Sequence, residues 1–193
     1  LIDHGVQIYM MPDLQEWKTD GNLTVNNFKE IKIEDLLPRS EIKVDMDAIG
    51  EMLNDSTVLI TGSAGSIGSE MVRQIAVFRP RKMILIDSAE TPQHNIRLMM
   101  RERFPDVECN VIVVSIVQQD RMEHIFSTAK PDYVFHAAAY KHVPMMEDNP
   151  SEAIYNNVLG TKIIADLSVK YGVKRFVMIS TDKAVNPTNV MGC

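Results

Sequence analysis

A glycine-rich turn between two regular elements constrains the fold of this chain more than any other feature. Residues 58–61 are apolar or β-branched and predict a buried strand, and apolar residues at helical spacing follow the turn. Gly62, Gly65 and Gly68 lie between them at a spacing of three. Glycine permits a left-handed backbone, the close approach of a pyrophosphate and tight packing of a helix on a strand. The residues predicted to line this phosphate site are Gly62, Ala64, Gly65, Ser66, Ile67 and Gly68.

An acidic residue at the end of a second predicted strand strengthens the dinucleotide interpretation. The strand is expected at 83–87 and ends in Asp87, about twenty residues after Gly68. A carboxylate there accepts hydrogen bonds from the adenosine ribose and repels a 2′-phosphate, so the sequence favours NAD over NADP. Glycine-rich turns also occur as plain connectors, and the alternative for Asp87 is a solvated aspartate that closes a strand.

Composition and charge narrow the class of protein. A net charge of −6 over 193 residues, without a basic block, argues against a nucleic-acid surface. Cys109 and Cys193 are too few for a disulfide framework or a zinc site, so we expect no metal and a reducing compartment, the cytoplasm. No apolar run approaches the ~20 residues of a membrane span, and no signal peptide opens the chain. We therefore expect a soluble chain. We interpret it as a fragment, because it starts at Leu1 and stops just after a motif.

The first 45 residues do not share the pattern of the rest of the chain. Strands are expected at 6–12 and 28–33, and we interpret residues 1–45 as the tail of a preceding α/β domain plus a linker. A plain solvated connector is the alternative. Apolar residues at helical spacing predict a short helix at 45–54, which opens an NAD-binding domain at 46–193.

Strand and helix patterns alternate regularly after residue 57. The predicted strands are 58–61, 83–87, 110–114, 133–137 and 176–180. Helices are expected at 121–129 and 151–171, the second with an apolar face of Ile154, Val158, Ile163 and Leu167. Strands buried on both faces and joined by helices require a parallel, doubly wound sheet. Right-handed crossovers place the carboxyl ends of all its strands on one edge.

The loops at that edge hold further candidate residues. Ala137, Ala138 and Ala139 would let a flat nicotinamide ribose lie against the backbone, although small residues also serve helix packing. Lys141 could reach a diphosphate, although a loop lysine is often only solvated. His142 is more typical of a structural, hydrogen-bonded histidine than of a catalytic one.

Four sequence blocks resemble the extended short-chain dehydrogenase/reductase superfamily, which implies a Rossmann-like α/β fold. The blocks are residues 61–70, 137–147, 157–161 and 180–192, and the resemblance covers about residue 31 to the end. Within the superfamily, the chain is similar to the nucleotide-sugar 4,6-dehydratases of polysaccharide biosynthesis. The long, membrane-associated form that acts on UDP-N-acetylglucosamine fits best, and the last block is the specific one.

The resemblance implies a role for each residue at the end of the chain. Transient oxidation at C4 by NAD makes the C5 proton of the sugar acidic, after which water leaves across C5 and C6. Thr181 would bind the substrate near C4, Asp182 would be the acid and Lys183 the base. These roles require a lowered pKa at Lys183 and a pKa of Asp182 raised by desolvation. The alternative is an exposed Asp–Lys pair that closes a strand.

Two positions depart from the pattern of many relatives. Met191 stands where many relatives carry a tyrosine that takes the C4 hydroxyl proton, so water with Asp182 or Thr181 would serve instead. Ser115 precedes Ile116, the expected adenine contact, where relatives usually show an aspartate. We expect serine at this position to weaken cofactor binding without abolishing it.

Family members continue beyond the equivalent of Cys193 with a lysine and a sugar-binding segment. We therefore expect the fold to be incomplete at its C-terminus and this chain alone to bind NAD weakly or not at all, without turnover. The long relatives also carry membrane helices before this region, and a homo-oligomer is left open. Two alternatives to the dehydratase stay open: a nucleotide-sugar epimerase of the same superfamily and a noncatalytic NAD-binding module.

Overall fold

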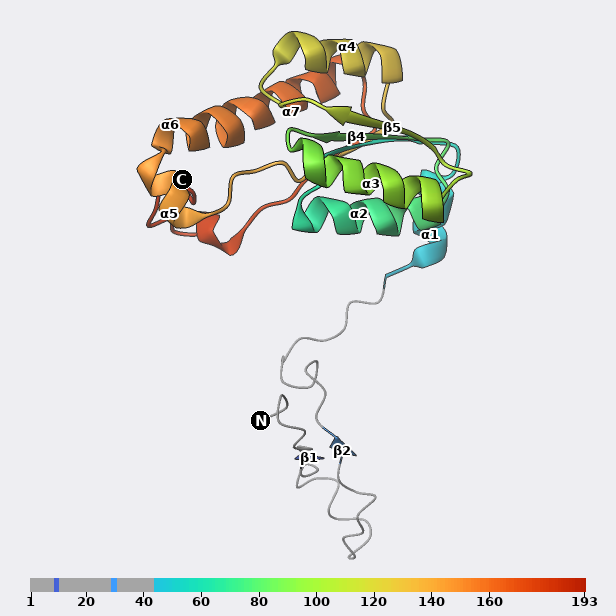
Figure 1. Cartoon of the computed structure of the whole chain (residues 1–193), viewed down its shortest axis with the longest axis horizontal. Coiled ribbons are helices and arrows are strands. Elements are labelled where there is room, and N and C mark those ends of the chain that lie inside the picture. Colours follow the sequence, from blue (N-terminus) through green and yellow to red (C-terminus); the bar gives the residue numbers. More distant parts are fainter. Residues whose placement is uncertain (1–8, 11–28, 31–43) are drawn as a thin grey trace, which may run out of the picture. The chain divides into compact units, whose positions relative to one another are not determined.

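The structure is a computed structural model that describes residues 9–10, 29–30 and 44–193 (Figure 1). The chain divides into two compact units, residues 1–44 and 45–193. In the first unit, β1 (Tyr9–Met10) and β2 (Lys29–Glu30) pair antiparallel. Both pieces fall within the two strands predicted there, and the rest of those strands lies outside the described residues. That residues 1–45 end a preceding α/β domain stays a prediction.

The second unit is built on a parallel sheet of five strands. They are β3 (Thr57–Thr61), β4 (Lys82–Asp87), β5 (Glu108–Val113), β6 (Tyr133–His136) and β7 (Arg175–Met178). Their order is β5-β4-β3-β6-β7, and every neighbouring pair is parallel. The predicted doubly wound sheet is confirmed, with strand ends displaced by one or two residues. The order reverses between β3 and β6, so a crevice is expected there at the carboxyl edge.

Helices cover both faces of this sheet. Figure 1 shows α2 (Ser66–Val77) and α3 (Glu90–Arg103) on one face, and α4 (Gln119–Ala129) and α7 (Thr161–Lys170) on the other. Successive strand residues point to opposite faces, so Val58 and Ile60 pack with the first helix pair and Leu59 with the second. Burial on both faces explains why the central strands β3 and β4 appear in the sequence as unbroken apolar runs, whereas residues of the outer strands β5 and β7 are largely exposed or half-buried.

The short helix before the sheet is also confirmed. α1 (Met46–Leu53) begins after Asp45, whose carboxylate accepts a hydrogen bond from the Ala48 N–H at 3.0 Å. Such a cap satisfies one of the free N–H groups at the start of a helix. Leu53 is fully buried in the core on the α2 side, so α1 docks onto the domain.

The long helix predicted at 151–171 is interrupted by a π-helical segment. α6 (Pro150–Ala153) leads into η5 (Ile154–Gly160), which leads into α7. The predicted apolar face is wrong in its first half, because Ile154 and Val158 are 59% and 58% exposed. A π turn holds more residues than an α turn, so the 3.6-residue period fails across it. Ile163 and Leu167, beyond the segment, are buried as predicted.

Two shorter helical segments complete the described part of the chain. They are α5 (Val143–Asp148) and the 3₁₀ turn η6 (Asp182–Ala184), which follow β6 and β7. No helix among the described residues has both the length and the apolar character needed to cross a bilayer.

A buried histidine joins the sheet to α7. The ring nitrogens of His136 lie 2.6 Å from the Thr61 hydroxyl and 2.8 Å from the Thr161 hydroxyl, and the ring stacks on Phe176. Burial lowers the pKa of His136 to about 4, so the ring is neutral at pH 7. His136 is thus a structural, hydrogen-bonded histidine. His142, for which that role was expected, is exposed.

The buried His136 makes stability fall with acid. Its pKa is near 6.5 in the unfolded chain and about 4 in the folded one, so below pH 6.5 the unfolded chain binds the extra proton. We expect up to about 3 kcal/mol of folding free energy to be lost as the pH falls from about 6.5 toward 4. Urea unfolding at pH 7, 6 and 5 measures this slope. His136→Gln should flatten it, and the exposed control His124→Gln should not; an unchanged slope in His136→Gln would contradict the assignment.

Candidate functional site

The glycine turn makes the closest backbone contacts at the carboxyl edge of the sheet. Gly62 has a φ of +68°, and a Cβ there would lie 2.6 Å from the Ala138 nitrogen. A Cβ on Gly68 would lie 1.9 Å from the Gly62 carbonyl oxygen. Two of the predicted reasons for glycine, the left-handed angle and the close helix packing, therefore hold in the structure.

The first turn of α2 presents donors beside a lysine from a distant loop. The Ser69 N–H donates to the Gly65 carbonyl, and the N–H groups of residues 66–68 find no acceptor within the described part of the chain. The Lys141 ammonium lies 3.1 Å from the Ser66 hydroxyl, although the two residues are 75 positions apart. Free N–H groups, the positive helix end and an ammonium together form a site suited to a phosphate.

Asp87 lies beside the same turn. Its carboxylate accepts hydrogen bonds from the Ala64 N–H at 3.0 Å and the Ala89 N–H at 2.9 Å. The acidic residue predicted at the end of the second strand is therefore joined to the glycine turn, as a ribose-binding carboxylate needs to be.

The glycine turn and Asp87 line one cleft of about 330 Å³, and Lys141 is not among its lining residues. The predicted cofactor residues that line it are Gly62, Ala64, Gly65, Asp87, Ser115, Ile116, Ala137, Ala138 and Ala139. Ser66, Ile67 and Gly68 continue from it into α2. A cleft whose walls come from the ends of β3, β4, β5 and β6 is the crevice expected where the strand order reverses.

Tyr140, in the loop expected at this edge, also lines the cleft, and sequence reasoning missed several other lining residues, among them Ser88, Ala89, Pro92 and Asn156. Ser88 and Ala89 directly follow Asp87, so their place at the sheet edge could have been inferred. Asn156 lies in the π-helical segment, which periodicity does not reveal.

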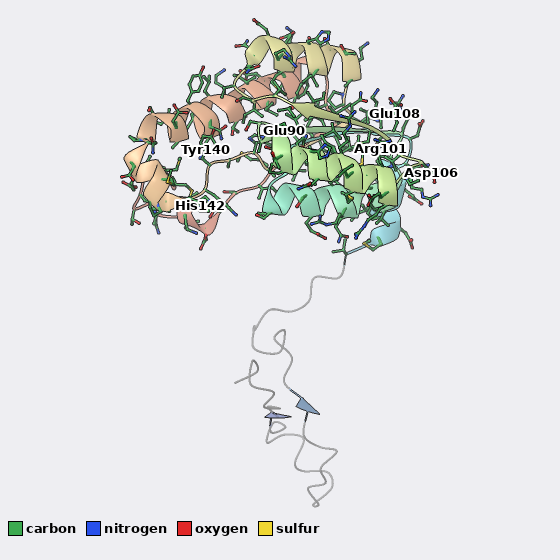
Figure 2. The ribbon with its side chains drawn as sticks, viewed as in Figure 1. Glu90, Arg101, Asp106, Glu108, Tyr140 and His142 are labelled. Carbon is green, nitrogen blue, oxygen red and sulfur yellow. The ribbon has the colours of Figure 1, made fainter. Side chains whose placement is uncertain are left out.

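Asn157 fixes the path of the loop that follows β6. Its side-chain oxygen accepts from the Tyr140 N–H at 2.8 Å, and its NH₂ group donates to the Tyr140 carbonyl at 2.9 Å. Figure 2 shows Tyr140 and His142 along this loop, between the sheet and α5. The two-bond clamp holds the alanines of the loop at the cleft wall.

The predicted catalytic residues lie at the same edge but outside the cleft lining. The Ile179 N–H donates to the His136 carbonyl, so the chain passes Thr181 just beyond the carboxyl end of β7. Thr181 accepts from the Lys183 N–H and donates to Asp182, whose carboxylate lies 3.7 Å from the Lys183 ammonium. Met191 returns to this segment, because a Cβ on its neighbour Gly192 would meet the Lys183 carbonyl.

The electrostatics of Asp182 differ from the expectation. Its side chain is 91% exposed, and the Thr181 hydroxyl and Lys183 ammonium lower its pKa. Desolvation was expected to raise that pKa, and the described residues do not supply it. As it stands, the geometry gives an ionised carboxylate beside a lysine.

Two further observations on the described residues concern metal binding and thiol chemistry. They hold no group of three or more His, Cys, Asp or Glu side chains arranged for a metal ion. Burial raises the pKa of the Cys109 thiol to about 12, so that thiol does not ionise at neutral pH.

Residues 58–193 match the family described as "Polysaccharide biosynthesis protein". The chain is 43% identical to the capsular polysaccharide biosynthesis protein CapD of Staphylococcus aureus over 97% of its length, but covers 31% of that protein. It is 33% identical to the UDP-N-acetylglucosamine 4,6-dehydratase (inverting) of Campylobacter jejuni and 37% identical to the UDP-glucose 4-epimerase of Rickettsia canadensis. In both cases the match covers 73% of this chain and 41% of the relative. The chain thus spans less than half the length of these relatives.

Two solved structures share the fold. Pen from Bacillus thuringiensis superposes with a TM-score of 0.66 at 30% identity, covering 72% of this chain and 43% of Pen. Bordetella bronchiseptica WbmG, solved in complex with NAD, gives a TM-score of 0.60 at 25% identity, covering 72% of this chain and 46% of WbmG. NAD, the cofactor expected from the sequence, is thus the cofactor that WbmG holds.

The contact between Gly68 and the turn predicts a large cost for one added methyl group. In Gly68→Ala the new Cβ would overlap the Gly62 carbonyl, so α2 must separate from β3. We expect a loss of about 3 kcal/mol in the free energy of unfolding. Gly50→Ala in α1 is the matched control, since its Cβ meets only Phe78 at 3.5 Å. Helix propensity should make that variant more stable by up to about 1 kcal/mol. Urea unfolding compares the two, and a Gly68→Ala variant as stable as the parent would refute the close packing.

Proposed function

The chain belongs to the polysaccharide biosynthesis family within the extended short-chain dehydrogenase/reductase superfamily, and we propose that it supplies the cofactor-binding part of an NAD-dependent nucleotide-sugar 4,6-dehydratase. Its substrate is a UDP-N-acetylhexosamine of the UDP-N-acetylglucosamine type, and its location is the cytoplasm. The proposal rests on one observation: the glycine turn, Asp87 and Lys141 lie together at the carboxyl edge of the sheet. Residues 181–183 follow β7 at the same edge.

The residues around the cleft fit a dinucleotide. Gly62 and Gly68 leave no room for a side chain where the turn packs, and the N–H groups of residues 66–68 with Lys141 would hold the diphosphate. Asp87 would bind the adenosine ribose, Ser115 and Ile116 the adenine, and the alanines 137–139 the nicotinamide ribose. Bound NAD supplies the hydride acceptor for C4 and the hydride donor for C6.

Thr181, Asp182 and Lys183 carry the proton transfers. The Lys183 amine takes the proton from C5, and the Asp182 carboxylic acid gives a proton to the C6 oxygen, which leaves as water. The Thr181 hydroxyl binds the substrate near C4. Because Met191 cannot accept a proton, the proton of the C4 hydroxyl passes to the Asp182 carboxylate, either through water or through the Thr181 hydroxyl, which gives its own proton to Asp182.

A nucleotide-sugar epimerase is the second candidate, because the Rickettsia canadensis relative is a UDP-glucose 4-epimerase. Epimerisation also oxidises C4 but needs no acid–base pair at C5 and C6, and the adjacent Asp182 and Lys183 favour elimination. A noncatalytic NAD-binding module is a third reading, suggested by Met191.

Product mass distinguishes these functions. The protein as its gene encodes it, incubated with NAD and UDP-N-acetylglucosamine, is expected to yield a product lighter by one water. Lys183→Ala should lower the rate by about 10²–10⁴-fold, because it removes the base. Lys162→Ala, which removes an exposed lysine paired with Asp166 on α7, should retain the parent rate. A product of unchanged mass and altered configuration would establish the epimerase, and no product would favour the binding module.

The Asp87 carboxylate predicts the choice between the two nicotinamide cofactors. Asp87→Asn keeps a side-chain acceptor but removes the charge that repels a 2′-phosphate. We expect the ratio of the Kd for NADP to that for NAD to fall about tenfold, or ~1.4 kcal/mol. Calorimetric titration with each cofactor measures it. Asp106→Asn is the control, since Figure 2 shows Asp106 at the opposite end of the domain from Tyr140, a residue of the cleft. An unchanged ratio in Asp87→Asn would exclude this role.

A further inference from the structure

A buried glutamine lies directly behind the glycine turn. Gln93 in α3 is fully buried. Its NH₂ group donates to the Leu85 carbonyl at 2.8 Å and the Ile112 carbonyl at 3.2 Å. Its side-chain oxygen accepts from the Ser63 hydroxyl at 2.9 Å. One side chain therefore joins α3, β4, β5 and the turn.

Ser63 is the residue of the turn through which this connection acts. It stands between Gly62 and Gly65, whose backbones lose the most conformational freedom on folding. Its side chain is also fully buried, so it faces the interior and lies outside the lining of the cleft. Its N–H donates to the Ile86 carbonyl, and its hydroxyl to Gln93. These two bonds fix the turn against the end of β4.

Burying the Gln93 amide costs free energy of desolvation, and filling the space in the core does not by itself require an amide. Burying a polar side chain is favourable only when its hydrogen bonds are made, and an apolar side chain of similar size would fill the same volume. The neighbouring Pro92 lines the cleft, so the position of α3 relative to the turn also sets the width of the cleft.

We propose that Gln93 is a positioning residue for the cofactor: through Ser63 it holds the glycine turn in the geometry that receives the pyrophosphate. The inference rests on the proposed NAD site, and it assigns Gln93 no contact with the cofactor. Gln93 reduces the motion of the turn before the cofactor binds. Binding then costs less conformational entropy, so the affinity for the cofactor is higher.

A double-variant comparison separates positioning from simple stability. Gln93→Met keeps the side-chain volume and removes the amide, and Ser63→Ala removes its hydroxyl partner. Each single variant leaves a buried polar group unpaired and should lose stability. The double variant also removes the Ser63 hydroxyl and should recover the part of the urea midpoint lost through that group, while the Leu85 and Ile112 carbonyls stay without the amide donor. We expect the Kd for NAD to rise about five- to tenfold in all three, including the double variant. Gln74→Met, at an exposed glutamine bonded to Glu70 on α2, is the matched control.

A second readout tests the inference without cofactor. Hydrogen exchange of the hydrogen-bonded amides of the turn, those of Ser63, Ala64, Gly65 and Ser69, should be faster in Gln93→Met and in the double variant than in the parent and in Gln74→Met. Unchanged exchange in these amides would overturn the positioning role, as would a double variant that regains the parent's Kd together with its stability. The NAD titrations use the protein as its gene encodes it. If that protein binds no NAD, the proposed function fails, and the exchange rates still decide whether Gln93 holds the turn.

Discussion

The approach of Gly62 to the backbone of Ala137 and Ala138 is the contact on which the site depends. The two segments directly follow β3 and β6, the neighbours between which the strand order reverses. Gly62 has no space for a Cβ and adopts a left-handed φ of +68°, and the chain enters α2 four residues later, at Ser66. The cleft exists because the chain turns away from the sheet in opposite directions on the two sides of this contact.

Three amide or imidazole side chains hold the loops around that contact. His136 joins β3 to α7, Asn157 clamps the loop after β6, and Gln93 ties the glycine turn to β4 and β5. Each uses every polar group it buries, and no buried side-chain donor or acceptor in the described residues lacks a partner. Satisfied polar networks of this kind favour one arrangement over others, because partial satisfaction is costly. The loops of the cleft therefore have a defined geometry before any ligand arrives.

The sequence predicted the sheet and the glycine turn because both depend on short-range patterns. Unbroken apolar runs mark strands buried on two faces, and the glycine spacing reflects local packing. Gln93 was not predicted, because a glutamine in a helix is ordinarily solvent-exposed and only the fold brings Ser63 to it. The exposure of Ile154 and Val158 was missed for another reason: the π-helical segment changes the helical phase, and no residue type signals it. Contacts between distant loops, such as that of Lys141 with Ser66, follow from topology once the parallel order is known.

The Asp182–Lys183 pair illustrates the limit of inferring electrostatics from residue type. A carboxyl group that acts as an acid near neutral pH needs a raised pKa, which burial supplies. Here the side chain of Asp182 is largely exposed, and its two neighbours lower the pKa. The described residues thus place the pair at the carboxyl edge of the sheet without desolvating it. In the proposed reaction the desolvation comes with the substrate: a sugar bound at the segment displaces water from Asp182, and the loss of hydration raises the pKa of its carboxyl against the lowering by Thr181 and Lys183. The acid then forms only in the complex, which ties the proton transfers at C5 and C6 to a bound substrate.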